Sequence, residues 1–226
     1  MSELTIVGLV ALVGFAALGQ TVTGFGFALM AMPLVTFVLG LRTAAPLVAL
    51  MGLTLYAINI IRYHASVIWR EVLHLGIAAA IGVPFGILLL ANVNESITKT
   101  LLGLILIAYA VYSWTRPVVR QLPGRPWTWL AGFLSGCLSG AYNMPGPPLI
   151  VYSSLQEWDR NEFRAVLQML FFISSVLTVG SHFIAQHVTV QVLTLYAYGV
   201  PALLFGVVVG ARLDPHVNKE LFRTIV

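Results

Sequence analysis

The sequence predicts an all-α membrane protein that crosses the bilayer several times, and three observations lead to this fold class. First, hydrophobic residues make up 59% of the chain and charged residues 9%, with a mean hydropathy of +0.92, whereas a soluble domain carries about 25% charged residues. Second, residues 4–41 contain no Asp, Glu, Lys or Arg. Third, one order of elements, a broken apolar segment followed by long apolar helices, occurs twice along the chain.

The first repeat is expected to cover residues 1–115. Its apolar segment 4–41 is longer than one bilayer crossing, which takes about 20 residues, and it is interrupted by Gly24-Phe25-Gly26 and followed by Pro33. An interrupted segment at membrane depth is stable only where its freed backbone groups face protein or an enclosed site. We therefore expect a broken or re-entrant helix hairpin. Further charge-poor runs predict three crossing helices, at residues 43–61, 71–91 and 97–115.

A linker at residues 116–126, rich in Pro and Arg, is expected in the cytoplasm and leads to the second repeat, residues 127–226. This repeat opens with another broken segment, 127–155. Its glycines Gly132, Gly136 and Gly140 recur on one helix face, where small residues let a second helix approach closely. The run from Asn143 to Pro148 contains three prolines, which a helix interior does not tolerate well. Two half-helices meeting inside the membrane fit this pattern.

The rest of the second repeat predicts helices at residues 163–184 and 189–210 and the beginning of a truncated last helix near Val217. The second repeat lacks a counterpart of the crossing at residues 97–115. We expect either that the natural chain continues for about 20 to 30 residues, the length of one more crossing, or that a partner protein covers this position.

Each repeat is expected to contain one hairpin and three crossings, an odd number, so the second repeat should be inverted relative to the first, and the distribution of charge supports this orientation. If each broken segment enters and leaves on one side, ten of the twelve Lys and Arg residues lie inside, and only Arg42 and Lys99 lie outside. Such a bias follows the positive-inside rule and predicts a multi-pass protein of a bacterial-type cytoplasmic membrane. Matched residues at an offset of 124, such as Gly82 with Gly206, support the repeat, although glycines also match by chance in a glycine-rich chain.

The chain resembles the TauE/SafE sulfite exporters, also called the four-toluene sulfonate uptake permease family. Three segments carry the resemblance: GFAALGQTVTGFGFALMAMPLV (Gly14 to Val35), GFLSGCLSGAYNMPGPPLIVY (Gly132 to Tyr152) and GARLDPHVNKELFRTIV (Gly210 to Val226). Members often carry Gly-Gly-Pro in the second segment, where this chain has Pro145-Gly146-Pro147. The resemblance covers essentially the whole chain and implies an integral membrane transporter of sulfur-containing anions such as sulfite and organosulfonates.

The candidate substrate site lies where the two broken segments meet. The N-terminus of a half-helix presents unpaired N–H groups and a partial positive charge, which suit a small anion without a buried cation. Gly24 and Gly26 could instead only ease packing, Asn143 could only cap a half-helix, and Gln20 could only bond neighbouring backbone. The expected substrate-binding residues are Gln20, Thr21, Thr23, Gly24, Phe25, Gly26, Tyr142, Asn143, Gly146 and Arg164.

These observations predict a secondary transporter that moves a small sulfur-containing anion, sulfite or an organosulfonate such as sulfoacetate, with export favoured. An anion channel, a carboxylate transporter and a structural membrane protein remain alternatives, and a homodimer stays open. The expected partners are the anion and the lipid bilayer, and no nucleic acid. We expect no enzyme, cofactor or metal, since catalytic motifs are absent, and the single Cys137 excludes an internal disulfide.

Overall fold

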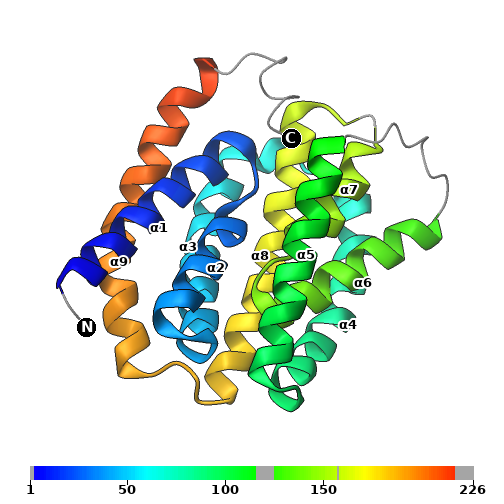
Figure 1. Cartoon of the computed structure of the whole chain (residues 1–226). Helices are drawn as coiled ribbons and strands as arrows, with labels where there is room; N and C mark the ends of the chain where they lie inside the picture. Colours follow the sequence, from blue (N-terminus) through cyan, green and yellow to red (C-terminus); the bar gives the residue numbers. More distant parts are fainter. Residues whose placement is uncertain (1–2, 116–124, 157, 217–226) are drawn as a thin grey trace.

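The computed structural model describes residues 3–115, 125–156 and 158–216, and this part of the chain is helical without strands (Figure 1). The α-helices are α1 (Glu3–Thr23), α2 (Phe27–Leu39), α3 (Leu41–Tyr63), α4 (Trp69–Asn92), α5 (Glu95–Thr115), α6 (Arg125–Tyr142), α7 (Gly146–Ser154), α8 (Arg160–Ile184) and α9 (Val190–Leu213). Two short 3-10 helices, η1 (His64–Ser66) and η2 (Asp214–His216), follow α3 and α9.

The first predicted break is confirmed between α1 and α2. The backbone turns at Gly24 and Gly26, whose φ angles are 92° and 107°. Glycine adopts this left-handed region without the steric cost that a Cβ imposes, so the Gly-Phe-Gly sequence ends one helix and starts the next. Pro33 lies inside α2 and does not interrupt it.

The second predicted break is confirmed between α6 and α7. Asn143 has a φ of 54°, a left-handed conformation that asparagine adopts more readily than most residues. Pro145 follows as the N-cap of α7, and Pro147 and Pro148 lie in its first turn, where a missing N–H costs no hydrogen bond. The sequence from Asn143 to Pro148 therefore stops α6 and starts α7.

The long helices follow the predicted crossings, with each boundary within three residues of the expected one. In the described part of the chain five helices are long and apolar enough to cross a membrane: α1, α3, α4, α8 and α9. The apolar parts of α2 and α5 are shorter. The chain is thus an all-helical, multi-pass membrane protein. The helix predicted from Val217 lies outside the described residues.

Helices α3 and α8 form the centre of the molecule and pack against each other. Their buried surfaces include an aromatic pair, Tyr56 and Phe171, with ring centroids 5.3 Å apart. The start of α8 is fixed by a capping box in which the Asp159 side chain accepts from the backbone N–H of Glu162 and the Glu162 carboxylate accepts from that of Asp159. This cap fixes where the first residues of α8 lie.

The most extensive helix pairs are α1 with α9 and α4 with α6. A Cβ on Gly206 of α9 would overlap the carbonyl oxygen of Gly14 in α1, and one on Gly82 of α4 would overlap that of Phe133 in α6. Only glycine permits these backbone approaches. The first helix of each hairpin therefore packs mainly on a helix from the other half of the chain.

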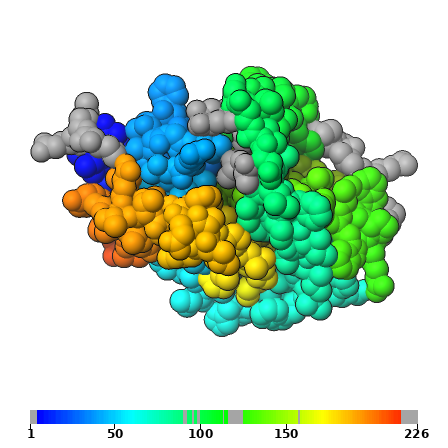
Figure 2. Space-filling model, turned by 90° about the horizontal axis from the view of Figure 1, so that it is seen from below, coloured from blue at the N-terminus to red at the C-terminus, as the bar shows by residue number. Residues whose placement is uncertain are grey.

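The two hairpins point in opposite directions. From its break, α2 runs toward the bottom of Figure 1, whereas α7 runs from its break toward the top. Seen from below, the α2–α3, α8–α9 and α4–α5 connections cover the lower end of the molecule side by side (Figure 2). Both breaks consequently lie between the two ends of the helical bundle.

Candidate functional site

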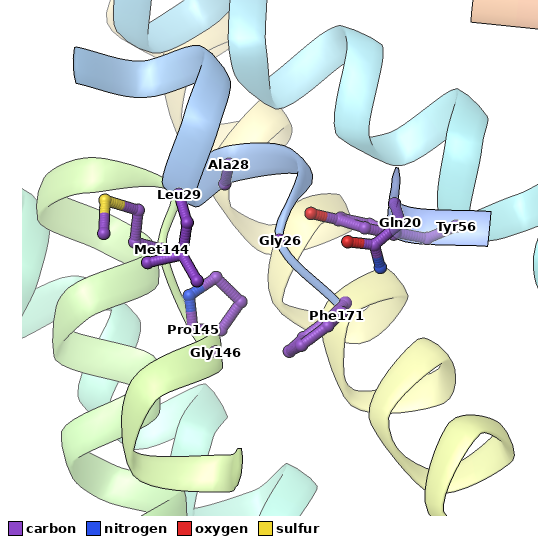
Figure 3. Close-up of a pocket in the computed structure, with 9 residues that line it drawn as sticks. All are labelled: Gln20, Gly26, Ala28, Leu29, Tyr56, Met144, Pro145, Gly146 and Phe171. Atoms are coloured by element: carbon purple, nitrogen blue, oxygen red, sulfur yellow. The ribbon is translucent and has the colours of Figure 1, made fainter. Parts of the chain in front are cut away.

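A small cavity lies between the two breaks (Figure 3). The first hairpin contributes Gln20, Gly26, Ala28 and Leu29, the second contributes Met144, Pro145 and Gly146, and α3 and α8 contribute Tyr56 and Phe171. Its volume of about 10 Å³ is roughly the room that one water molecule needs. The cavity therefore has room for about one water molecule and is too small for a sulfite ion.

The N-terminus of α2 forms one wall of this cavity. The backbone N–H of Phe27 donates to Oε1 of Gln20 at 2.9 Å. Ala28 and Leu29, which line the cavity, follow in the first turn, where N–H groups have no carbonyl partner within the helix. The partial positive charge of the helix end adds to these donors. This wall is suited to an anion.

The N-terminus of α7 forms the opposite wall. Gly146 is its first residue, and Pro147 and Pro148 follow. Because proline has no N–H, Gly146 supplies the one backbone donor among these first three residues. Ser135 donates its hydroxyl to the carbonyl oxygen of Pro145 at 2.8 Å and fixes the turn. This end thus offers the helix dipole and a single N–H, so the two walls are chemically unequal.

The first break is held by side chains from α1 and α8. Gln20 and Gln168 both donate to the carbonyl oxygen of Gly24, at 3.1 and 3.0 Å. Arg164 donates to the carbonyl oxygen of Val22. A Cβ built on Gly24 would lie 2.7 Å from Cγ of Arg164. Position 24 therefore requires glycine for two reasons, the positive φ of the backbone and the close approach of α8.

The second break is held by α3. Nδ2 of Asn143 donates to the carbonyl oxygen of Ala45 at 2.7 Å, and the Asn143 backbone N–H donates to the carbonyl oxygen of Ser139 at 2.8 Å. Each break is thus tied to a long central helix of the other half of the chain, the first to α8 and the second to α3.

The structure brings three of the ten predicted site residues to the cavity wall: Gln20, Gly26 and Gly146. Gly24 and Phe25 lie in the first break beside it, and the hydroxyl of Thr23 lies 2.6 Å from the carbonyl oxygen of Phe25.

The remaining predicted residues lie away from the wall. Thr21 donates to the carbonyl oxygen of Ala17 within α1 and lies against Gly210 of α9. Tyr142 and Asn143 are buried at the end of α6. Arg164 is buried beside the first break. The predicted set thus falls in and around the two breaks, with Thr21 turned toward α9.

Sequence reasoning missed several residues that shape the site. Tyr56, Met144 and Phe171 carry no polar pattern that distinguishes them from other apolar residues of crossing helices. Gln168 follows Arg164 by one helix turn, and this spacing predicts that the two side chains face the same way. Asp214, which pairs with Arg164 at 2.8 Å, is the first acidic residue after Glu162, and it follows a predicted crossing on the side where Arg164 was expected.

Within the described ranges, no group of three or more His, Cys, Asp or Glu side chains is placed to hold a metal ion. The cavity wall carries no carboxylate, imidazole, amine or guanidinium, since its polar side chains are the amide of Gln20 and the phenol of Tyr56.

Comparison with known proteins agrees with this architecture. The chain is 31% identical over 231 residues to a protein described as a probable sulfite/organosulfonate exporter TauE from Cupriavidus necator, and the match covers 98% of this chain and 89% of that protein. No solved structure matches the chain significantly. The family model described as sulfite exporter TauE/SafE matches residues 9–226. A match over almost the entire chain shows that this protein belongs to the TauE/SafE family of anion transporters.

Proposed function

We propose that the chain is a secondary transporter that exports a small sulfur-containing anion, sulfite or an organosulfonate such as sulfoacetate, across a bacterial-type cytoplasmic membrane. One observation carries the proposal: the N-terminal ends of α2 and α7 lie on the same cavity between two broken spans. Paired half-helix N-termini at membrane depth are a recurrent way of binding anionic groups in transporters. The relative from Cupriavidus necator is described as an exporter of the same substrate class.

The cavity wall carries no charged side chain, which suits a site that binds an anion and then releases it. Its donors are backbone N–H groups, the amide of Gln20 and the phenol of Tyr56. These groups attract an anion without fixing a buried cation beside it. An anion held in this way is released more easily than one paired with a desolvated guanidinium.

The small volume of the cavity fits a constricted state of an alternating mechanism better than a continuous open pore. A sulfonate cannot enter a space of about 10 Å³ unless the two hairpins move apart. We propose that residues 1–115 and 127–226 are inverted repeats, and that the parts that move around the site each combine helices from both repeats, since α1 packs on α9 and α4 on α6. The crosswise ties support this, since Gln168 holds the first break and Asn143 holds the second break to α3.

Export is the direction that the membrane potential favours. Moving one negative charge out of a cell whose interior is negative gains about 2.3 kcal/mol per 100 mV. Outward movement therefore needs little coupling to another ion, whereas uptake would need a cation or a proton. A carboxylate would be recognised by the same donors, so the ligand must be established by measurement.

The first experiment is a thermal-stability screen of the purified protein with sulfite, sulfoacetate, taurine, sulfate and short carboxylates. The anion that binds the native state raises the melting temperature in a saturable way. Counterflow in proteoliposomes then separates the mechanisms. A transporter exchanges labelled for unlabelled anion, while a channel passes current without saturable exchange. A screen in which no anion shifts the melting temperature, with no counterflow of any of them, would contradict the proposal.

A matched pair of variants connects the transport to the cavity. A Cβ on Gly146 would lie 3.4 Å from Cδ1 of Ile150 and 3.9 Å from Cζ of Phe171, which is tight but tolerable. We expect Gly146→Leu to fold, to place its side chain in the cavity and to abolish counterflow. Gly8→Leu adds the same side chain to the exposed face of α1, where nothing lies within 4 Å of the added Cβ. We expect this control variant to retain counterflow. Normal anion exchange by Gly146→Leu would show that the cavity does not lie on the transport path.

A further inference from the structure

A cluster of arginines surrounds one carboxylate at the end of the molecule where η2 follows α9. Oδ2 of Asp214 accepts from Arg62 at 2.6 Å and from the hydroxyl of Tyr63 at 3.4 Å. Oδ1 accepts from Arg160 at 2.5 Å and from Arg164 at 2.8 Å. Both oxygens are therefore bound by donors on α3 and α8, which is the coordination expected of a receptor for an oxyanion.

The cluster leads from the surface to the interior. The side chains of Arg62 and Arg160 are 31% and 23% exposed, whereas that of Arg164 is 1% exposed. The three guanidinium groups thus form a graded path at the end that the charge distribution predicts to be cytoplasmic. Planar guanidinium groups match the oxygens of carboxylates and other oxyanions with two parallel donors.

Arg164 connects this cluster to the first break. It donates to Asp214 from one nitrogen and to the carbonyl oxygen of Val22 from the other. One turn further along α8, Gln168 donates to Gly24 in the same break. An anion bound by Arg164 would therefore lie next to the α1–α2 hairpin, on the side expected to face the cytoplasm. The N-terminus of α2 in this hairpin forms one wall of the cavity.

We propose that the cluster of Arg62, Arg160, Arg164 and Tyr63 is an inner anion-binding site, occupied in this structure by the Asp214 carboxylate, which an oxyanion arriving from the cytoplasm displaces. This inference rests on the proposed function for the identity of the anion. A buried arginine is costly to leave without a counter-charge. Exchange of one anion for another keeps Arg164 paired throughout, so Asp214 leaves as the oxyanion enters.

Displacement of Asp214 also has a structural consequence. Asp214 begins η2, directly after α9, and its partners lie at the end of α3 and the start of α8. The ion pairs therefore join α9 to both central helices. When the oxyanion takes the place of the carboxylate, this connection is released, and the cytoplasmic end of the bundle is free to open.

The experiment compares Asp214→Ala with Glu71→Ala in potassium sulfate and potassium gluconate of equal ionic strength. Glu71 is an acidic residue at the start of α4, and its carboxylate accepts from Tyr152 at 2.9 Å. Both variants should melt at a lower temperature than the wild type in gluconate. Sulfate should restore the melting temperature of Asp214→Ala alone. Half-restoration should need a roughly tenfold lower sulfate concentration than any effect on the wild type, because a tethered carboxylate competes at millimolar effective concentration.

Equal effects of sulfate on Asp214→Ala and Glu71→Ala would overturn the proposal and leave the cluster as a structural ion-pair network. If Asp214→Ala cannot be purified, Asp214→Asn keeps the size of the side chain and gives the same comparison. Sulfate binding needs no transport, so the result stands even if the cavity carries another anion. In proteoliposomes that transport, Asp214→Asn should lower both the KM at the cytoplasmic face and the maximal rate, whereas a structural role would leave KM unchanged.

Discussion

Gln20 and Gln168 donate their side-chain amides to the same acceptor, the carbonyl oxygen of Gly24, at 3.1 and 3.0 Å. The first comes from α1 and the second from α8. Oε1 of Gln20 also accepts from Phe27 at the start of α2. A single glutamine thus bridges both sides of the break, and a second one holds the break against a central helix.

We expect Gln20→Leu to destabilise the protein more than Gln168→Leu. The first change removes one of the two donors to Gly24 and leaves the Phe27 N–H without its acceptor, and an unsatisfied buried group costs about 1–3 kcal/mol. The second leaves Gln20 in place and should cost about 0.5–1.5 kcal/mol. Thermal unfolding of the purified variants measures the difference. Gln191→Leu, at an exposed position of α9, is the control, and a Gln20→Leu variant as stable as this control would refute the bridging role.

Replacement of Gly206 by alanine should disrupt the packing of α9 on α1. The added Cβ would overlap the carbonyl oxygen of Gly14 and lie 3.1 Å from the backbone nitrogen of Leu18. Because both neighbours are backbone atoms, the helices must separate, and we expect a marked loss of folded protein. Size-exclusion chromatography of the solubilised protein provides the measurement. Gly8→Ala serves as the control, since its Cβ would enter open space and alanine favours a helix by about 1 kcal/mol.

The two glycines of the first break should respond differently to alanine. Both have positive φ angles, which cost a residue with a Cβ about 1–2 kcal/mol. Gly26 has open space around the added Cβ, whereas at Gly24 the Cβ would lie 2.7 Å from Cγ of Arg164. Gly26→Ala should therefore lose only the stability that the positive φ costs, and Gly24→Ala should lose more stability because its Cβ also meets Arg164. Equal melting temperatures for the two variants would show that α8 does not press on the break.

At Asn143, glycine should be tolerated better than alanine. Both substitutions remove the hydrogen bond from Nδ2 to the carbonyl oxygen of Ala45. Only alanine adds the cost of a φ of 54°, which is about 1–2 kcal/mol. Asn143→Gly should consequently melt at a higher temperature than Asn143→Ala, with both below the wild type. The reverse order would mean that the second break does not keep this backbone conformation.

Much of the fold could be predicted because membrane chemistry restricts what the chain can do. Gly24-Phe25-Gly26 and Asn143–Pro148 are interruptions that a continuous helix does not accommodate, and both are breaks in the structure. The crossings follow from charge-poor length alone, so their boundaries were predicted closely. Pro33 and Pro46 lie inside helices, because membrane-spanning helices tolerate proline better than soluble helices do.

The candidate site could be predicted only as far as its breaks. Gln20, Gly26 and Gly146 belong to the breaks themselves, and they lie on the cavity wall. Tyr56 and Phe171 reach the same wall from α3 and α8, and nothing in their local sequence separates them from aromatic residues that face lipid. The meeting of Arg62, Arg164 and Asp214 joins residues 50 and 152 positions apart. Only tertiary packing decides such contacts.

The crosswise partnership of the hairpins has a consequence for how the protein is made. α1 is the first of the described helices to leave the ribosome, and its main partner, α9, is the last of the described long helices to be synthesised. Until α9 is synthesised, the face of α1 that carries Gly14 lacks its main packing partner in the membrane. A fragment that stops after α5 would leave both α1 and α4 without their chief neighbours, so neither half of this protein should assemble without the other.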